Sequence, residues 1–402
     1  MNSMNLMKDS QIEARAACAG TVIWDSGRDL GFDDMSLLFS SPVTTLSVPP
    51  DGTEKDLETL FLELERGLND GLFAAGWIAY EAGYLLIPKL RQHLLTKRPN
   101  VPLAWFGLYE KPELFHPKDT PLPPGHHSPN ISLKLDTTRE QFIRAIDKIH
   151  DYIRSGDTYQ INYTIRGHFP FHGNAFDLYQ TLKQRQQVGY SAFIHPAEGL
   201  DILSLSPELF FKKRGRKIQS KPMKGTAKRG KDPEEDKRIE RELGLDEKNR
   251  AENVMIVDLL RNDLGRICET GSVKVPELFK VERYQTLFQM ISTVEGLLSK
   301  GTRWSQIFRA LFPCGSITGA PKIRSMEIIA EIENTPRGIY TGAIGVITPQ
   351  GDCVFNVAIR TITIKEGQGE IGIGAGITIG SSGIEEFEET VLKARFLTQD
   401  IT

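Results

Sequence analysis

The sequence has 402 residues, 40% of them hydrophobic and 25% charged, with a formal net charge of −3, as in an ordinary globular protein. The near-neutral charge argues against a general nucleic-acid binder, which carries a basic excess. No uninterrupted apolar run approaches the roughly 20 residues that a membrane-spanning helix needs.

The N-terminal region predicts a subdomain over residues 1–125. It begins with a β-rich stretch, and an amphipathic helix then ends near Asn69. One face of that helix carries Leu57, Leu60, Phe61, Leu64 and Leu68. The apolar segment "GWIAYEAGYLLIPKL" follows. The stretch from His116 to Asn130 contains five prolines, which predict a loop. A second domain is expected over residues 137–398.

The second domain begins with helix and strand signals. Thr137 and Glu140 have the spacing of a capping box. The helix that follows points Phe142, Ile146, Ile149 and Ile153 inward. The stretch "YQINYTIRGHF" alternates, which predicts a strand whose polar face lines a cavity. That face carries Gln160, Asn162, Thr164 and Arg166. The stretch "ILSLSPELFFKK" predicts another strand.

The remaining pattern combines helices with a strand meander. Helices are expected at 246–264 and 321–333. After Tyr340, three strands joined by Pro-Gln-Gly-Asp and Glu-Gly-Gln-Gly turns are predicted, with a final helix at 384–399. Neighbouring strands with separate helices indicate an α+β fold with antiparallel sheets.

Lys224 lies in a run of ten basic residues from Lys212 to Lys231. The run is either a solvated loop, a nucleic-acid patch without the aromatics that stack on bases, or the context of a reactive lysine. A nucleophilic lysine must be neutral, and neighbouring cations favour that form.

Acidic residues on two predicted helices are candidate metal ligands. Glu386, Glu389 and Lys393 lie on one face of the final helix. Glu252 lies on the helix at 246–264. Carboxylates from two helices suit Mg²⁺, although solvated helix faces explain the same spacing.

Three further features have open alternatives. The glycine-rich "GIGAGITIG" suits an anion or a tight turn. Arg360, expected mid-strand, suits a carboxylate ligand or an internal acid. Glu208 is either a buried general acid or an exposed residue at a strand end. The cysteines Cys18, Cys268, Cys314 and Cys353 lack metal spacing, and the N-terminus lacks the apolar region of a signal peptide, so separate thiols in a cytoplasmic protein are expected.

Nine motifs occur in an order that resembles the chorismate-utilising enzymes, which include anthranilate, isochorismate, salicylate and aminodeoxychorismate synthases. They are "GDTYQINYT", "SPELFF", "PMKGT", "KNRAENVMIVDLLRNDLGRI", "FPCGSITGAPKIRSMEII", "RGIYTGAIG", "AIRT", "GAGI" and "EEFEETVLKA". The resemblance covers about residues 137–397, and residues 1–125 resemble the N-terminal part of component I. It implies two large stacked antiparallel sheets flanked by outer helices.

The resemblance also implies a site for chorismate. Mg²⁺ would lie between Glu252 and Glu389, near Glu386, and bind the ring carboxylate. The enolpyruvyl carboxylate would be held by Arg360, Tyr340 and the amides of Gly374, Ala375 and Gly376. Ser316 and Lys393 match other positions near the site.

Two positions separate members of the family. Gln160 stands where isochorismate and salicylate synthases carry a lysine base, so activation of water at C2 is not expected. Lys224 stands where anthranilate synthases have alanine and where component I of aminodeoxychorismate synthases has lysine. The resemblance therefore implies amination at C4 through a covalent adduct on Lys224, with Glu208 as general acid.

The implied product is 4-amino-4-deoxychorismate, a precursor of p-aminobenzoate and folate. Ammonia would come from a separate glutamine amidotransferase subunit. The alternatives are an anthranilate or 2-amino-2-deoxyisochorismate synthase, or an oligonucleotide-binding protein on an inactive scaffold. Asn249 and Gln289 depart from the family pattern. Anthranilate synthases have histidine at the position of Gln289.

Overall fold

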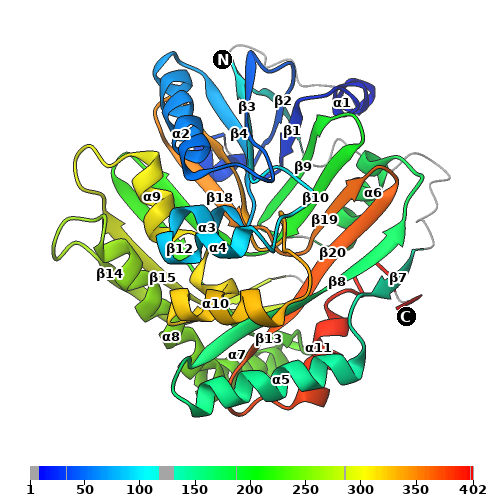
Figure 1. Cartoon of the computed structure of the whole chain (residues 1–402), viewed down its shortest axis with the longest axis vertical. Helices are drawn as coiled ribbons and strands as arrows, with labels where there is room; N and C mark the ends of the chain where they lie inside the picture. Colours follow the sequence, from blue (N-terminus) through cyan, green and yellow to red (C-terminus); the bar gives the residue numbers. More distant parts are fainter. Residues whose placement is uncertain are drawn as a thin grey trace.

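Two large sheets form the centre of this computed structural model, which describes residues 9–32, 34–116, 131–186, 188–284, 287–398 and 400–401. Helices cover their outer faces (Figure 1). All pairings between named strands are antiparallel in the described residues except that of β21 with β7. The predicted α+β fold is confirmed. The expected loop at 116–130 lies almost wholly outside the described residues.

The first sheet has eleven strands in the described chain. Their order is β21 (Asp400–Ile401), β7 (Ser132–Leu135), β8 (Gln160–Pro170), β20 (Gln368–Ile377), β19 (Thr361–Lys365), β10 (Leu200–Ser206), β9 (Tyr190–Ala197), β1 (Thr21–Trp24), β2 (Ser36–Phe39) and β6 (Glu113–Phe115), with β16 (Gly319–Ala320) beside β8.

The second sheet has ten strands in the same described ranges. Their order is β13 (Met223–Lys228), β15 (Leu287–Leu297), β12 (Lys217–Lys221), β11 (Leu209–Arg214), β18 (Cys353–Val357), β17 (Ala343–Ile347), β4 (Phe73–Ile78), β5 (Ala104–Tyr109) and β3 (Thr44–Val48), with β14 (Lys274–Arg283) beside β15. Buried side chains of both sheets share one core, including Trp24 from the first and Trp77 from the second.

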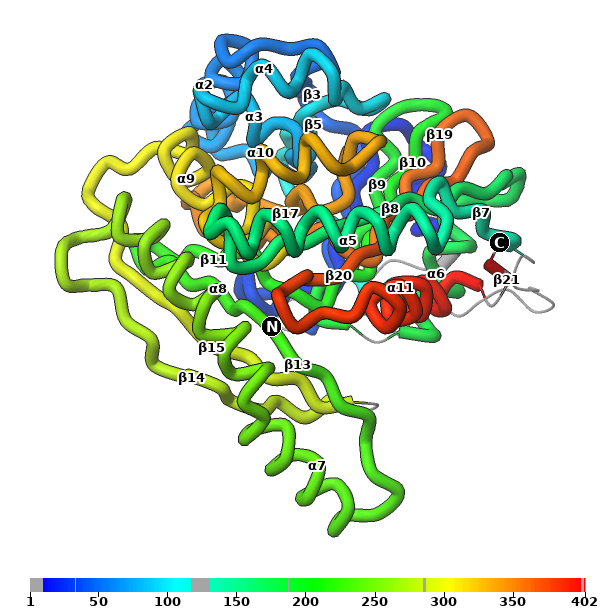
Figure 2. The backbone as a smooth tube through the Cα atoms, turned by 60° about the horizontal axis from the view of Figure 1, so that its bottom comes forward, coloured from blue at the N-terminus to red at the C-terminus, as the bar shows by residue number. Residues whose placement is uncertain are grey.

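The helices begin and end close to several predicted positions. They are α1 (Asp9–Ala16), α2 (Glu54–Asn69), α3 (Ala82–Leu86), α4 (Arg91–Leu94), α5 (Arg139–Arg154), α6 (Ala175–Arg185), α7 (Pro233–Leu245), α8 (Glu247–Gly265), α9 (Trp304–Leu311), α10 (Lys322–Ile332) and α11 (Gly383–Leu392), with 3₁₀ turns η1 (Gly27–Leu30), η2 (Pro88–Leu90) and η3 (Gly315–Ile317). In Figure 2, α7 and the ends of β13 and β14 project from the body.

The predicted capping box is wrong by one residue. Thr138 caps α5, because its side chain accepts from the backbone of Gln141 and the Gln141 side chain accepts in return. Thr137 instead donates its hydroxyl to Asp136. The final helix is also shorter than predicted and ends at Leu392.

Two predicted strands are each divided between the sheets. The stretch "ILSLSPELFFKK" is β10 in the first sheet and β11 in the second, because Pro207 lacks the N–H that a continuous ladder requires. The stretch around Arg360 is β18 and β19, so the described residues between Tyr340 and α11 form four strands rather than three. Arg360 lies at the bend with a φ of 49°, not mid-strand.

The two crossings are hydrogen-bonded to each other. The amide of Val357 donates to the carbonyl of Glu208 at 3.0 Å, and the amide of Leu205 donates to the carbonyl of Arg360 at 3.0 Å. Strands β1 to β6 belong to residues 1–125 and pair with later strands in both sheets. The division at 1–125 and 137–398 stays a prediction.

Candidate active site

Four distant segments meet around the amine of Lys224. Its Nζ lies 3.5 Å from Oε2 of Glu252 on α8, and each side chain is about one-sixth exposed, at 15% and 16%. A Cβ placed on Gly376 of β20 would lie 3.1 Å from that Nζ and 2.6 Å from Nε2 of Gln160 on β8. The structure therefore brings together Lys224, Glu252, Gln160 and Gly376 as the motifs predicted.

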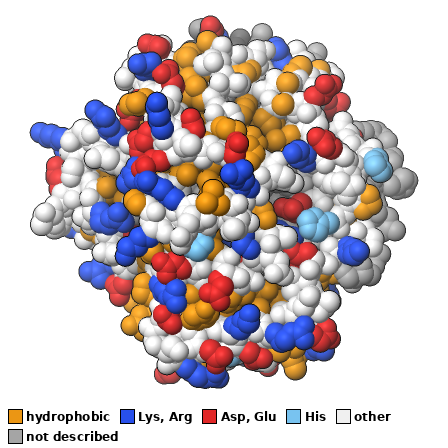
Figure 3. All heavy atoms as spheres, in the orientation of Figure 1, with side chains coloured by type: hydrophobic (Ala, Val, Ile, Leu, Met, Phe, Trp, Pro, Cys, Tyr) orange, Lys and Arg blue, Asp and Glu red, His pale blue; other side chains and the backbone are white. Residues whose placement is uncertain are grey.

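Other members of the basic run face acids on other elements. Lys212 pairs with Asp29 at 2.8 Å and Lys217 with Glu295 at 2.8 Å. Arg229 pairs with Asp236. Figure 3 shows Lys and Arg side chains interspersed with Asp and Glu on the face that it displays. The run is thus largely neutralised and does not form a free nucleic-acid patch, and these cations are engaged away from Lys224.

Glu208 is buried at the crossing between the sheets, with an exposed fraction of 4%. Burial raises the pKa of its carboxyl group to about 7, although the hydroxyl of Ser316 and the charge of Lys224 lower it. Its Oε1 is buried without a hydrogen-bond partner among the described residues. A carboxyl group that is protonated near neutral pH and has a free oxygen suits a general acid.

Of the two predicted carboxylates of α11, that of Glu389 lies within electrostatic reach of Lys224. Burial raises the pKa of Glu386, whose Oε1 accepts from Ser381 at 2.7 Å, and the charge of Glu389 raises it further. Burial opposes ionisation of Glu389 too, but the charges of Lys393 and two other lysines, Lys224 among them, lower its pKa overall.

The described residues supply carboxylate donors for the predicted metal site, but they do not form a preassembled coordination shell. No group of three His, Cys, Asp or Glu side chains converges in the parts of the chain that the structure describes. Glu252 and Glu389 each face a lysine instead. Carboxylate oxygens such as those of Glu252, Glu386 and Glu389 are donors that Mg²⁺ takes, and a cation would relieve the repulsion between the two glutamates of α11, so the metal site stays a prediction.

Arg360 and Tyr340 are both largely buried. The Nη1 of Arg360 donates to the neutral amide of Gln186 at 2.9 Å, and burial lowers the pKa of its guanidinium. Among the described residues Arg360 forms no ion pair with an internal acid, which was the alternative partner. The ring of Tyr340 lies under Arg166 at 5.2 Å. A Cβ on Gly372 would lie 2.0 Å from that ring, so β20 passes directly over it.

Two other predicted residues contact their neighbours in the structure. The Ser316 hydroxyl lies 3.3 Å from the Cys314 thiol. The Lys393 amine donates to the carbonyl of Gly374 at 2.9 Å and pairs with Glu389 at 3.0 Å. Lys393 therefore ties α11 to the glycine-rich strand β20. Whether Gly374, Ala375 and Gly376 bind a carboxylate stays a prediction.

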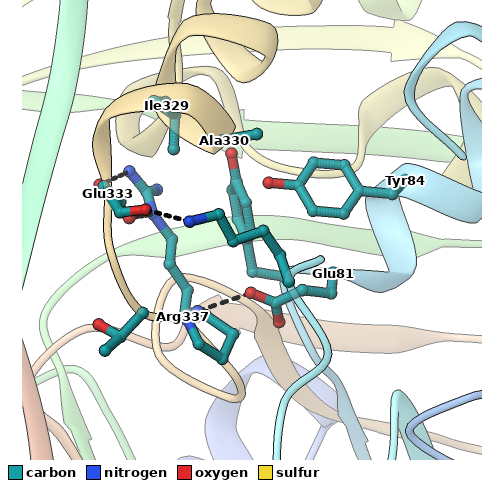
Figure 4. A pocket seen from close by; sticks show the side chains of 10 residues that line it. Glu81, Tyr84, Ile329, Ala330, Glu333 and Arg337 are labelled. Carbon is teal, nitrogen blue, oxygen red and sulfur yellow. Dashed lines mark hydrogen bonds and ion pairs between the residues drawn. The ribbon is translucent and has the colours of Figure 1, made fainter. Parts of the chain in front are cut away.

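A buried charge cluster behind the site was missed by the sequence analysis. Figure 4 shows Glu81 and Tyr84 across a small cavity from Glu333 and Arg337. Arg337 pairs with Glu333 at 2.7 Å. Glu81 accepts from the amides of Arg337 and Gly338 at 2.6 and 2.9 Å, and burial raises its pKa to about 7. Two features of the sequence could have indicated this cluster: Glu81 is a lone glutamate in an apolar segment, and Glu333 and Arg337 are opposite charges four positions apart.

Arg337 connects this cluster to the site. Its guanidinium donates to the carbonyl of Ile317 at 2.7 Å and to the carbonyl of Asn162 at 2.6 Å. Ile317 is adjacent to Ser316, and Asn162 lies two residues beyond Gln160. The polar face of β8, predicted to line a cavity, thus packs against buried charges.

Comparison with known proteins gives these residues a family. Residues 47–399 match the chorismate binding enzymes. The chain belongs to this family. It is 45% identical over 264 residues to the aminodeoxychorismate synthase, chloroplastic, of Arabidopsis thaliana, a match covering 65% of this chain and 29% of that protein. It is 42% identical over 257 residues to the aminodeoxychorismate synthase component 1 of Bacillus subtilis, covering 64% and 54%.

A solved structure supports the fold. The anthranilate synthase component I of Streptococcus pneumoniae superposes with a TM-score of 0.78 and 26% identity, covering 91% of this chain and 92% of that one. The two stacked antiparallel sheets expected from the resemblance are confirmed. The chain spans only 29% and 54% of the lengths of the two sequence relatives. None of its described helices combines the length and apolar character that crossing a membrane requires.

Proposed function

We propose that this chain is component I of an aminodeoxychorismate synthase, which converts chorismate and ammonia to 4-amino-4-deoxychorismate. The observation that carries the proposal is the enclosed amine of Lys224, 3.5 Å from Glu252 and beside the buried amide of Gln160. The family and the names of the two sequence relatives support chorismate as the substrate.

The first half of the reaction forms a covalent adduct. The neutral amine of Lys224 attacks C2, the two ring double bonds shift, and the C4–O bond breaks. Glu208 donates its proton to the departing hydroxyl, which leaves as water. The adduct nitrogen retains its positive charge, and Glu208 becomes a carboxylate.

The second half reverses the shift. Ammonia attacks C4, the double bonds return, and the C2–N bond breaks, so that Lys224 leaves as a neutral amine. The new ammonium group at C4 gives up one proton, which restores the protonated form of Glu208, so the net reaction converts chorismate and ammonia to 4-amino-4-deoxychorismate and water. While Lys224 occupies C2, ammonia cannot add there.

The supporting groups complete the proposal. Glu252, Glu386 and Glu389 would hold Mg²⁺, whose charge would offset that of a substrate carboxylate. Arg360, with its neutral partner Gln186, would receive the enolpyruvyl carboxylate. We further propose that a glutamine amidotransferase subunit supplies the ammonia, and that the enzyme is a cytoplasmic transferase of p-aminobenzoate and folate synthesis.

The decisive experiment supplies chorismate, Mg²⁺ and ammonium and identifies the products by mass and retention. We expect 4-amino-4-deoxychorismate from the unmodified chain. Lys224→Ala should slow the reaction by about 100-fold or more, or divert it to the C2-aminated product. Anthranilate or isochorismate as the main product of the unmodified chain would contradict the proposal, as would an unchanged Lys224→Ala variant.

A second candidate is amination at C2, as in an anthranilate synthase. The fold match to the Streptococcus pneumoniae enzyme favours it. Lys224 argues against it, because its amine lies where C2 chemistry would need space. The product assay separates the two candidates.

A further inference from the structure

Lys224 lies on a β-bulge. Met223 pairs with Ile291 and Thr226 pairs with Gln289, so β13 advances three residues while β15 advances two. The extra residue disrupts the regular ladder and leaves local backbone groups without their usual partners. The bulge therefore determines which way the Lys224 side chain points.

Gly225 makes this bulge possible. Its φ is +76°, which L side chains adopt only with strain. A Cβ added there would also lie 2.8 Å from Cγ of Asn249 on α8. Asn249 therefore packs against the bulge.

Gln289 holds the bulge through both ends of its amide. Its Nε2 donates to the carbonyl of Gly225 at 3.0 Å, and its Oε1 accepts from the hydroxyl of Thr226 at 2.9 Å. These bonds attach the two residues that follow Lys224 to β15. A side chain thus supplies contacts that the interrupted ladder does not.

β13 needs such support because it is an edge strand. In the part of the chain that the structure describes, β15 is its only strand partner. An edge strand has ladder hydrogen bonds on one side only, and a shift in register of one residue would turn Lys224 to the other face. The amine would then leave Glu252 and Gly376.

We propose that Gln289 is a positioning residue that holds the Lys224 amine at the carbon it attacks, an inference that rests on the proposed function. Gln289 acts through the backbone carbonyl of Gly225 and the hydroxyl of Thr226, and its loss leaves Lys224 present but misdirected.

The test uses three variants assayed with chorismate, Mg²⁺ and ammonium. Gln289→Met removes both hydrogen bonds at nearly constant volume. Gln289→His keeps an N–H donor for the Gly225 carbonyl. Thr226→Val alters an exposed side chain and removes one of the two bonds. Gln219→Met is the matched control, since Gln219 on β12 contacts Glu295 on the same strand β15, away from the bulge.

For Gln289→Met we expect kcat to fall about 10- to 100-fold while KM for chorismate changes less than about threefold, because the bound substrate remains but the nucleophile is displaced. The share of C2-aminated product should rise, which general destabilisation would not cause. Thr226→Val should show a smaller shift in the same direction. Gln289→His should restore most C4 amination, and Gln219→Met should match the unmodified chain.

Gln289→Met with unchanged kcat and product ratio would overturn the inference. If Gln289→Met does not fold, Thr226→Val decides: an unchanged product ratio overturns the inference and a shifted one supports it. Lys224→Ala distinguishes a failure of the proposed function from a failure of the positioning role of Gln289. If that variant behaves like the unmodified chain, the proposed function itself fails; if it is impaired while both bulge variants are normal, the positioning role alone fails.

Discussion

Glu208 has an acid–base character that determines how the proposed reaction depends on pH. Its pKa is raised from 4.5 to about 7 by burial, so the carboxyl group is protonated below that value and ionised above it. A general acid acts only in its protonated form. kcat should therefore decline as the pH rises through about 7, as measured by initial rates at saturating chorismate.

Glu208→Gln tests the origin of that decline. The amide cannot donate a transferable proton, so kcat should fall by about 10²- to 10⁴-fold. The residual rate of this variant should no longer decline as the pH rises through about 7. If the variant retains both the rate and the decline of kcat with rising pH, another group is the acid.

The motifs predicted that Lys224 and Glu252 lie together with Gln160 and Gly376, while their roles stay predictions. The sequence could not show that Glu208 is buried beside Ser316, because that depends on where the chain crosses between sheets. Nor could it show that the Gln289 side chain bonds to the carbonyl of Gly225, because this contact requires a bulge that no local sequence pattern predicts.

Helix α11 and helix α8 supply the carboxylates of the proposed metal site. Replacing Glu252 or Glu389 by Gln removes a charged oxygen donor while preserving shape. The Mg²⁺ concentration for half-maximal activity should rise at least about tenfold in each variant. Glu388→Gln, on the same helix at an exposed position, is the control and should leave that concentration unchanged.

Arg337 pairs with Glu333 at the end of α10, and its guanidinium also donates to the carbonyls of Ile317 in η3 and Asn162 in β8. Arg337→Met would remove the nearer of the two arginines that pair with buried Glu333 and leave only Arg166, at 3.7 Å, which should cost about 3 kcal/mol of unfolding free energy. Arg324→Met on α10 breaks a pair with Asp157 that is about one-third exposed, and should cost about 1 kcal/mol or less. Denaturant melts of both variants make the comparison, and equal losses would contradict it.

The amphipathic periodicity predicted α2 and α5 because each helix buries one apolar stripe. The two sheet crossings escaped prediction for a physical reason. Residues on both sides of Pro207 alternate as strand residues do, and burial in a shared core leaves no change in hydrophobicity where one sheet ends and the other begins.

For the whole molecule, the paired basic run predicts little affinity for nucleic acids. With a net charge of −3 and acids facing Lys212, Lys217 and Arg229, few cations are free to displace counterions from phosphates. Fluorescence anisotropy with a labelled single-stranded oligonucleotide should show no saturable binding at about 0.15 M salt. Tight binding that weakens steeply with added salt would contradict this prediction.

The pairing of β1 with β9 and of β4 with β17 places the first third of the chain inside both sheets. A fragment that begins after residue 125 would expose two long strand edges with unpaired amides and carbonyls. Such edges recruit other chains, so the fragment should aggregate rather than survive as a smaller enzyme. The molecule is in this sense indivisible: the residues proposed to be catalytic come from the later segment, but the sheets that carry them are completed by the earlier one.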